Sequence, residues 1–214
     1  MLRLEKELRE NLKENYERKM LTSVSIAREI AVYAHRNQKR LNGTPYIFHP
    51  YRIADTYLQL INEQDENFDA DELCHHGIPL EGVIEVAWLH DVLEDTEYTE
   101  EEIADIYKNQ GLETYYRLYM KTPLLLITHD KSEPYPLYIE KVCTHQVSAL
   151  VKFLDLNDNT CALELDILGD FEVDRIHRYA MYMKRINDQH HFIEKLNAYY
   201  NYLNEKAKTI NKRI

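Results

Sequence analysis

The chain has 214 residues, of which 44% are hydrophobic and 29% are charged, a composition typical of a soluble globular protein with a sizeable core. Its formal net charge of −11 argues against nucleic-acid partners, because binding a phosphate backbone needs a basic surface. No apolar run is long enough to span a membrane, and three cysteines without a CxxC pair suit a reducing compartment, so we expect a cytoplasmic protein.

The N-terminal part of the chain predicts two helices. Leucines at helical spacing predict an amphipathic helix over residues 2–19, which we assign as an N-terminal extension to a domain of residues 20–214. Its charges are mixed, which favours either a solvated face or a contact within a homo-oligomer. A second helix is predicted from a cap at residues 22–23 to His35, with Tyr33 on its inner face.

The middle of the chain continues with a loop and two helices. Residues 38–46 carry positive charge and the turn residues Asn, Gly and Pro, which predict a loop. Pro50 suits the first turn of a third helix, which we place just after His49, and Pro79 opens a central helix predicted to end near Thr96.

The remaining sequence also predicts helices. Thr99 and Glu102 form a capping-box pattern that starts a helix, and Gly111 ends it. Further helical segments are predicted at residues 112–128, 146–155 and 173–208, the last with a break near residues 187–188. No segment alternates apolar and polar residues over a strand's length, and only 5 Gly and 6 Pro occur, so the predicted fold class is all-α.

The central helix contains an unusual set of ionisable residues. One continuous helix would place His90 four residues before Glu94 and Asp91 four residues before Asp95, as two stacked pairs on one face. Apolar neighbours predict partial burial, which is unfavourable for uncompensated charge. A divalent cation held by His90 and Asp91 would compensate it and leave the acid pair for proton transfer. The alternative is a solvated acidic end of a helix.

Two further residues complete a candidate metal site. His49 precedes the third helix, and Asp155 lies near the end of an apolar helix. Two imidazoles and two carboxylates suit a borderline cation such as Mn²⁺, Fe²⁺ or Zn²⁺ better than Ca²⁺ or Mg²⁺. The alternatives are a core histidine bonded to a backbone carbonyl and an aspartate that caps a helix or turn.

Three segments carry a resemblance to a known family. Residues 34–50 read AHRNQKRLNGTPYIFHP, residues 90–96 read HDVLEDT and residues 151–159 read VKFLDLNDN. The order His49, His90-Asp91, Asp155 resembles the H…HD…D pattern of the HD phosphohydrolase superfamily. The segments themselves resemble signatures of RelA/SpoT-type alarmone hydrolases, in particular the short stand-alone proteins. This resemblance covers about residues 20–185 and implies an HD-domain helical bundle.

The resemblance also implies an activity and a set of site residues. It implies one divalent ion, usually Mn²⁺, with four ligands: His49, His90, Asp91 and Asp155. It implies a nucleotide substrate, guanosine tetra- or pentaphosphate, from which water attack at the 3′-phosphorus releases pyrophosphate. The catalytic residues implied are Glu94 and Asp95, which would activate or orient the water, and Asn159, which would shape the site. The residues expected to meet the nucleotide are Lys39, Arg40 and Tyr46.

Two departures from the family pattern leave the substrate open. Leu41 stands where the family usually has lysine, and Leu156 stands where it usually has Arg or Lys. The chain could therefore hydrolyse another phosphorylated nucleotide, or bind an alarmone without turnover. A purely structural helical bundle is the remaining alternative.

Overall fold

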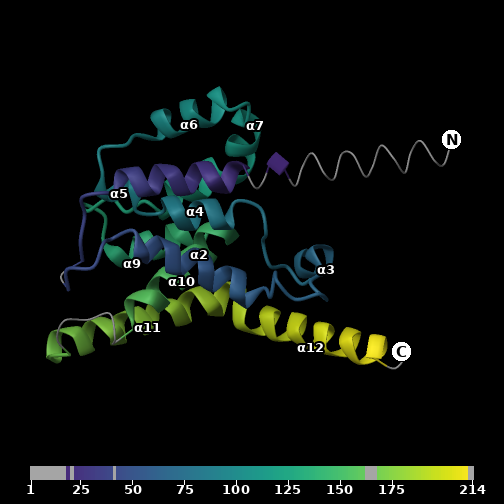
Figure 1. The fold of residues 1–214 in the computed structure, drawn as a ribbon. Helices are drawn as coiled ribbons and strands as arrows, with labels where there is room; N and C mark the ends of the chain where they lie inside the picture. The colour runs from purple at the N-terminus through teal and green to yellow at the C-terminus, as the bar shows by residue number, and fades with distance from the viewer. Residues whose placement is uncertain (1–17, 20–21, 41, 162–167, 212–214) are drawn as a thin grey trace.

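The computed structural model describes residues 18–19, 22–40, 42–161 and 168–211, which form helices joined by loops (Figure 1). Within these ranges extended pairing is limited to one isolated bridge between Lys39 and Pro45. The predicted all-α class is therefore confirmed. The predicted extension at residues 2–19 lies almost entirely outside the described residues. No helix in the described ranges is long and apolar enough to span a membrane.

The helices follow one another with short connections. Residues 22–34 form the first long helix. The remaining elements are α2 (Phe48–Leu60), α3 (Ala70–His75), α4 (Val83–Leu89), α5 (Val92–Asp95), α6 (Glu100–Asn109), α7 (Glu113–Tyr115), the π-helix η1 (Tyr116–Met120), α8 (Lys121–Ile127), α9 (Tyr135–Val142), α10 (Gln146–Asn159), α11 (Asp170–His190) and α12 (Phe192–Asn211).

Helix α10 lies at the centre of the molecule. It packs against α2, α4, α8 and α11, and α2 also packs against α4. In Figure 1, α11 and α12 run along one side of this group, and α6 covers the opposite side. Every residue of α4 is buried, and α10 buries eight of its residues, so both helices belong to the core. Polar side chains on these helices are therefore held by tight packing.

The predicted central helix is divided into two. Gly82 has φ 78° and precedes α4, so the helix begins after Gly82 rather than at Pro79. Helix α4 ends at Leu89 and α5 begins at Val92, with His90 and Asp91 in the turn between them. The backbone at Asp91 has φ −99° and ψ −5°, which departs from regular helix geometry. The prediction of one continuous helix with stacked pairs is therefore wrong.

Three local predictions need smaller corrections. Helix α2 begins at Phe48, so His49 lies inside its first turn rather than before it. Tyr33 is 57% exposed, because the small residues Ala27 and Ala31 occupy the inner face of the first helix. The C-terminal break falls at His191, whose φ of 54° is left-handed. The capping box at Thr99 is present as predicted.

Candidate metal centre and active site

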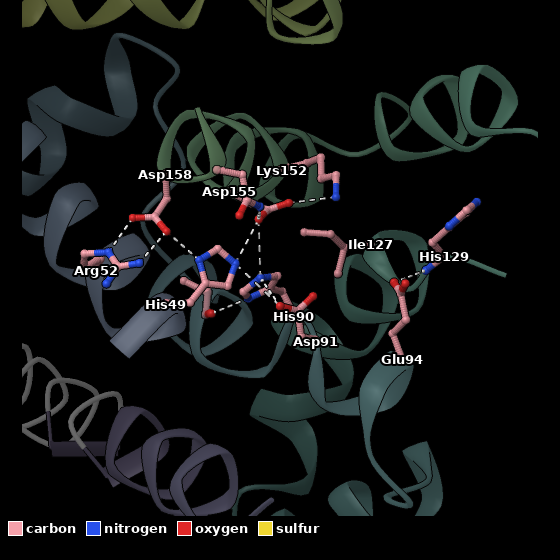
Figure 2. Close-up of polar contacts among 12 residues, drawn as sticks. His49, Arg52, His90, Asp91, Glu94, Ile127, His129, Lys152, Asp155 and Asp158 are labelled. Carbon is pink, nitrogen blue, oxygen red and sulfur yellow. Dashed lines mark hydrogen bonds and ion pairs between the residues drawn. The ribbon is translucent and has the colours of Figure 1, made fainter. Parts of the chain in front are cut away.

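The four predicted metal ligands come from three parts of the helical core. His49 lies on α2, His90 and Asp91 lie in the turn between α4 and α5, and Asp155 lies on α10. Both imidazoles are 2% exposed, and Asp155 is 4% exposed. Figure 2 shows these side chains directed toward one another. The packing of α10 against α2 and α4 therefore joins residues that are far apart in sequence.

The distances among these side chains are short. His49 Nε2 lies 3.1 Å from Asp155 Oδ1 and 3.6 Å from Asp91 Oδ2. His90 Nε2 lies 2.9 Å from Asp91 Oδ2 and 3.8 Å from Asp155 Oδ1. His49, His90 and Asp91 thus form one compact group, and Asp155 Oδ1 lies beside its two imidazole nitrogens. Imidazole and carboxylate donors are those of a borderline divalent metal.

Hydrogen bonds orient both imidazoles for metal binding. His90 Nδ1 donates to the carbonyl oxygen of Ala87 at 2.8 Å, and His49 Nδ1 donates to Asp158 Oδ2 at 2.6 Å. With the protons on Nδ1, each Nε2 lone pair faces the cluster. His90 Nε2 is buried and has no hydrogen bond, although it lies 2.9 Å from Asp91 Oδ2. The side chains therefore fit a divalent ion, and His49, His90 and Asp91 form a candidate metal site.

The charges in the cluster perturb one another. Burial by itself would raise the pKa of Asp91, but the adjacent His90 holds it well below its usual range. Burial would lower the pKa of His90, but the Asp91 carboxylate raises it to about 9. The metal-free cluster is therefore held together by charge, and a bound cation would replace a proton there.

Lys152, a lysine whose side chain is 13% exposed, completes the charge balance. Lys152 Nζ lies 2.8 Å from Asp155 Oδ2, on the side of the carboxylate opposite the histidines (Figure 2). It also lies 5.2 Å from the ring centroid of Tyr138. Burial would lower the pKa of this ammonium, but Asp155 raises it well above its usual value. In the sequence, this pairing is indicated by a lysine that lies within an apolar helix three residues before Asp155.

Arg52 and Asp158 form a second supporting pair. Arg52 Nε donates to Asp158 Oδ1 at 2.6 Å, and its NH2 group donates to Oδ2 at 2.9 Å. Asp158 lies one helical turn after Asp155 on α10, and Arg52 lies one turn after His49 on α2. The matching spacing of three residues in both helices was the sequence signal for this pair.

The predicted acid pair lies on α5, which directly follows the turn of His90 and Asp91. The Glu94 carboxylate is half-buried and accepts a hydrogen bond from the backbone N–H of His129 at 3.2 Å. Burial raises the pKa of Glu94 above its ordinary value. Figure 2 shows Glu94 set apart from the histidines and directed toward His129. The Asp95 carboxylate is more exposed and lies 3.6 Å from Lys131 Nζ.

Three predicted residues contact the candidate ligands or their neighbours. The Tyr46 hydroxyl donates to Asp91 Oδ2 at 2.5 Å, and Asn159 Nδ2 donates to Asp155 Oδ1 at 2.6 Å. Arg40 in turn donates to Asn159 Oδ1 at 2.9 Å. The structure therefore places these three side chains around the ligand cluster.

The other substrate-related positions lie differently. Lys39 is exposed on the loop before α2, where its backbone pairs with Pro45. Leu41, the first departure from the family pattern, lies outside the described residues. Leu156, the second departure, is 1% exposed and packs into the core. That substitution therefore changes the core rather than the surface near the ligand cluster.

Comparisons with known proteins agree with the resemblance. No family model matches the chain. A guanosine-3′,5′-bis(diphosphate) 3′-pyrophosphohydrolase of Haemophilus influenzae is 38% identical over 76 residues, which cover 36% of this chain and 9% of that protein. The enzyme of the same name, MESH1, of Danio rerio is 33% identical over 90 residues, which cover 41% of this chain and 39% of that protein. The matches thus span well under two thirds of these relatives.

A solved structure matches over most of the chain. It is described as a metazoan orthologue of SpoT that hydrolyses ppGpp, and it superposes with a TM-score of 0.54 at 24% identity, covering 88% of this chain and 95% of the other. The HD-type helical fold is thereby confirmed. The named relatives also confirm the resemblance to RelA/SpoT-like hydrolases that the three signatures predict.

Proposed function

Because the chain resembles HD-type RelA/SpoT-like hydrolases, we propose that it removes the 3′-pyrophosphate from guanosine 3′,5′-bis(diphosphate) in a metal-dependent reaction. The observation that carries this proposal is the meeting of two Nε2 atoms, each with its Nδ1 anchored, with oxygens of Asp91 and Asp155. The activity printed for the relatives supports the choice of substrate.

We assign four ligands to one metal ion: His49, His90, Asp91 and Asp155. Equal numbers of imidazole and carboxylate donors favour Mn²⁺ or a similar borderline ion. Such an ion supplies Lewis-acid chemistry, because it offsets phosphate charge and makes water a stronger nucleophile at neutral pH. Lys152 neutralises the charge at Asp155 Oδ2, while Asp155 Oδ1 faces the imidazole of His49.

Glu94 is assigned as the proton acceptor for the attacking water. Burial raises the pKa of this carboxyl above its ordinary value, which makes it a better proton acceptor than an exposed glutamate. The hydrogen bond from the His129 backbone fixes one carboxylate oxygen and leaves the other for water. Asp95, at the end of α5, is assigned to orient the water or the pyrophosphate end of the substrate.

Basic and polar side chains near the ligand cluster are assigned to the nucleotide. Arg40 is 16% exposed and lies beside Asn159, so it can meet a phosphate close to the metal ligands. Lys39, on the exposed loop, adds positive charge to a protein that is acidic as a whole. Tyr46 and Asn159 hold Asp91 and Asp155 in place through hydrogen bonds, and we assign both to the surroundings of the reacting phosphate.

The test is a product assay on purified protein. The full chain is stripped of metal with a chelator, supplied with Mn²⁺ and incubated with ppGpp, and the products are separated by anion-exchange chromatography. GDP and pyrophosphate in equal amounts, formed only when metal is present, are the expected result.

Other outcomes separate the remaining candidates. Turnover of a different nucleotide in a parallel panel, without turnover of ppGpp, would reject the substrate and keep the metal chemistry. Tight binding of ppGpp without products would identify a sensor rather than an enzyme. An absence of both binding and turnover in metal-loaded protein would reject the proposed function.

A further inference from the structure

A second set of charged side chains lies beside the proposed metal ligands but is not part of the ligand set. It consists of Asp158 on α10 and Arg52 on α2, with Arg40 approaching from the loop before α2. Asp158 is the shared partner, because its Oδ2 atom accepts from His49, Arg52 and Arg40. One carboxylate therefore links an imidazole ligand to two guanidinium groups.

The geometry at Asp158 fixes which way its carboxylate faces. Arg52 donates to both of its oxygens, at 2.6 and 2.9 Å, in the two-pronged arrangement that only a guanidinium provides. His49 Nδ1 lies 2.6 Å from Oδ2 on the side away from the other ligands. Asp158 therefore cannot turn toward the metal position without losing these bonds. Any effect of Asp158 on a bound metal would therefore act through the His49 ring.

A carboxylate in this position acts on the histidine in two ways. It fixes the proton on Nδ1, which leaves the Nε2 lone pair available, and it holds the ring plane in place. It also makes the ring a stronger electron donor, because the negative charge stabilises the partly positive imidazole of a metal complex. His90 receives weaker support, since its Nδ1 donates to the neutral carbonyl oxygen of Ala87.

We infer that Asp158, fixed by Arg52, is a positioning residue that sets the metal affinity of His49. This inference rests on the proposed metal centre and goes beyond it. It states that Asp158 and Arg52, which are not ligands themselves, make His49 a stronger ligand than His90. Metal affinity can be measured without any substrate, so the inference stands apart from the identity of the nucleotide.

The experiment is a calorimetric titration of Mn²⁺ into the metal-free full chain. Asp158→Asn keeps the shape of the side chain and removes its charge, and we expect its dissociation constant for Mn²⁺ to rise by about 10- to 100-fold. Arg52→Lys keeps a positive charge but loses the two-pronged contact, and we expect a smaller rise in the same direction. Asp105→Asn, an exposed acid on α6, is the matched control and should leave the constant unchanged.

The outcomes separate this inference from the proposed function. Circular dichroism first establishes that each variant is folded. If the role of Asp158 is merely structural, Asp158→Asn lowers the stability but leaves the Mn²⁺ affinity of the folded protein unchanged. That result would overturn the inference and leave the metal centre intact. If Asp158→Asn does not fold, an unchanged affinity in Arg52→Lys overturns it instead. If the unaltered chain binds no Mn²⁺, the metal centre and the inference both fall.

Discussion

At the scale of single residues, the proposed active centre depends on buried charges that are neutralised in pairs. Asp155 meets His49 on one side and Lys152 on the other, while Asp158 meets His49 and Arg52. Removing one member of a buried pair is more harmful than never having the pair, because the remaining charge stays in a region of low dielectric. Substituting one residue of such a pair should therefore cause a measurable loss of stability.

Lys152→Met should destabilise the metal-free protein. The substitution keeps much of the aliphatic stem but leaves one Asp155 oxygen buried without its cation, which is expected to lower the free energy of unfolding by about 3 kcal/mol. Urea denaturation monitored by circular dichroism measures the loss. Lys184→Met, which breaks an exposed pair with Asp188, is the control and should change the stability by less than about 1 kcal/mol. Equal effects of both substitutions would argue against a special role for Lys152.

Glu94→Gln should separate chemistry from metal binding. The amide can still accept the hydrogen bond from His129 but cannot take up a proton, so kcat for the proposed reaction should fall by about 100-fold or more. The Mn²⁺ affinity should stay close to that of the unaltered chain, because Glu94 is not among the assigned ligands. Glu97→Gln on the exposed turn serves as the control in the same steady-state assay. Full activity in Glu94→Gln would reject its assigned role.

At the scale of elements, the position of His90 depends on where α4 begins. Gly82 adopts φ 78°, and a Cβ atom at this residue would lie 2.4 Å from the carbonyl oxygen of Tyr119 in η1. The start of α4 is thus fixed by a close backbone contact that only glycine permits. Seven buried residues later the helix ends at Leu89, directly before the two candidate ligands.

Gly82→Ala should therefore be harmful both to stability and to the site. The alanine is strained at positive φ and collides with η1, so the free energy of unfolding should fall by about 2 kcal/mol or more. Gly111→Ala is the matched control, because Gly111 has φ 72° but no atom within 4 Å of the added Cβ. Thermal and urea unfolding of the two variants isolate the effect of the collision. Equal losses would show that the positive φ alone is responsible.

At the scale of the whole molecule, a buried acid in the core links stability to pH. Glu85 is 1% exposed and accepts a hydrogen bond from the Tyr115 hydroxyl at 3.0 Å. Burial raises the pKa of its carboxyl above the ordinary value of 4.5. Between the unfolded and the folded pKa, the folded state binds more protons than the unfolded state. The contribution of Glu85 to stability is therefore full below pH 4.5 and declines as pH rises toward its folded pKa.

Glu85→Gln should remove this decline. The amide keeps an acceptor for Tyr115 and does not ionise, so the variant should gain stability relative to the unaltered chain as pH rises from 4.5 toward neutrality. Urea denaturation of both proteins at several pH values gives the difference directly, and contributions from other groups cancel. A difference that does not vary with pH would show that the pKa of Glu85 is the same in the folded and the unfolded protein.

The sequence alone predicted the fold class, which the structure confirms, and it named four candidate ligands. Helical periodicity and caps predict helices from local interactions, and the three signatures are local as well. Their resemblance to the H…HD…D pattern implied His49, His90, Asp91 and Asp155 as ligands, and the packed core brings these four side chains together. The exact ends of helices were less predictable, because the start of α4 depends on the close contact of Gly82 with Tyr119, which is distant in sequence.

Only the tertiary structure showed which side chains surround those ligands. The one-helix prediction stacked His90 over Glu94, but the turn at Asp91 directs Glu94 toward His129. The partnerships of Lys152 with Asp155, and of Asp158 with Arg52 and His49, arise where α10 crosses α2 and α4. A sequence gives the order of donor and acceptor residues but not which of them come into contact. Hydrogen bonds and ion pairs depend on distances of a few ångströms across helices, which exist only after the core has packed.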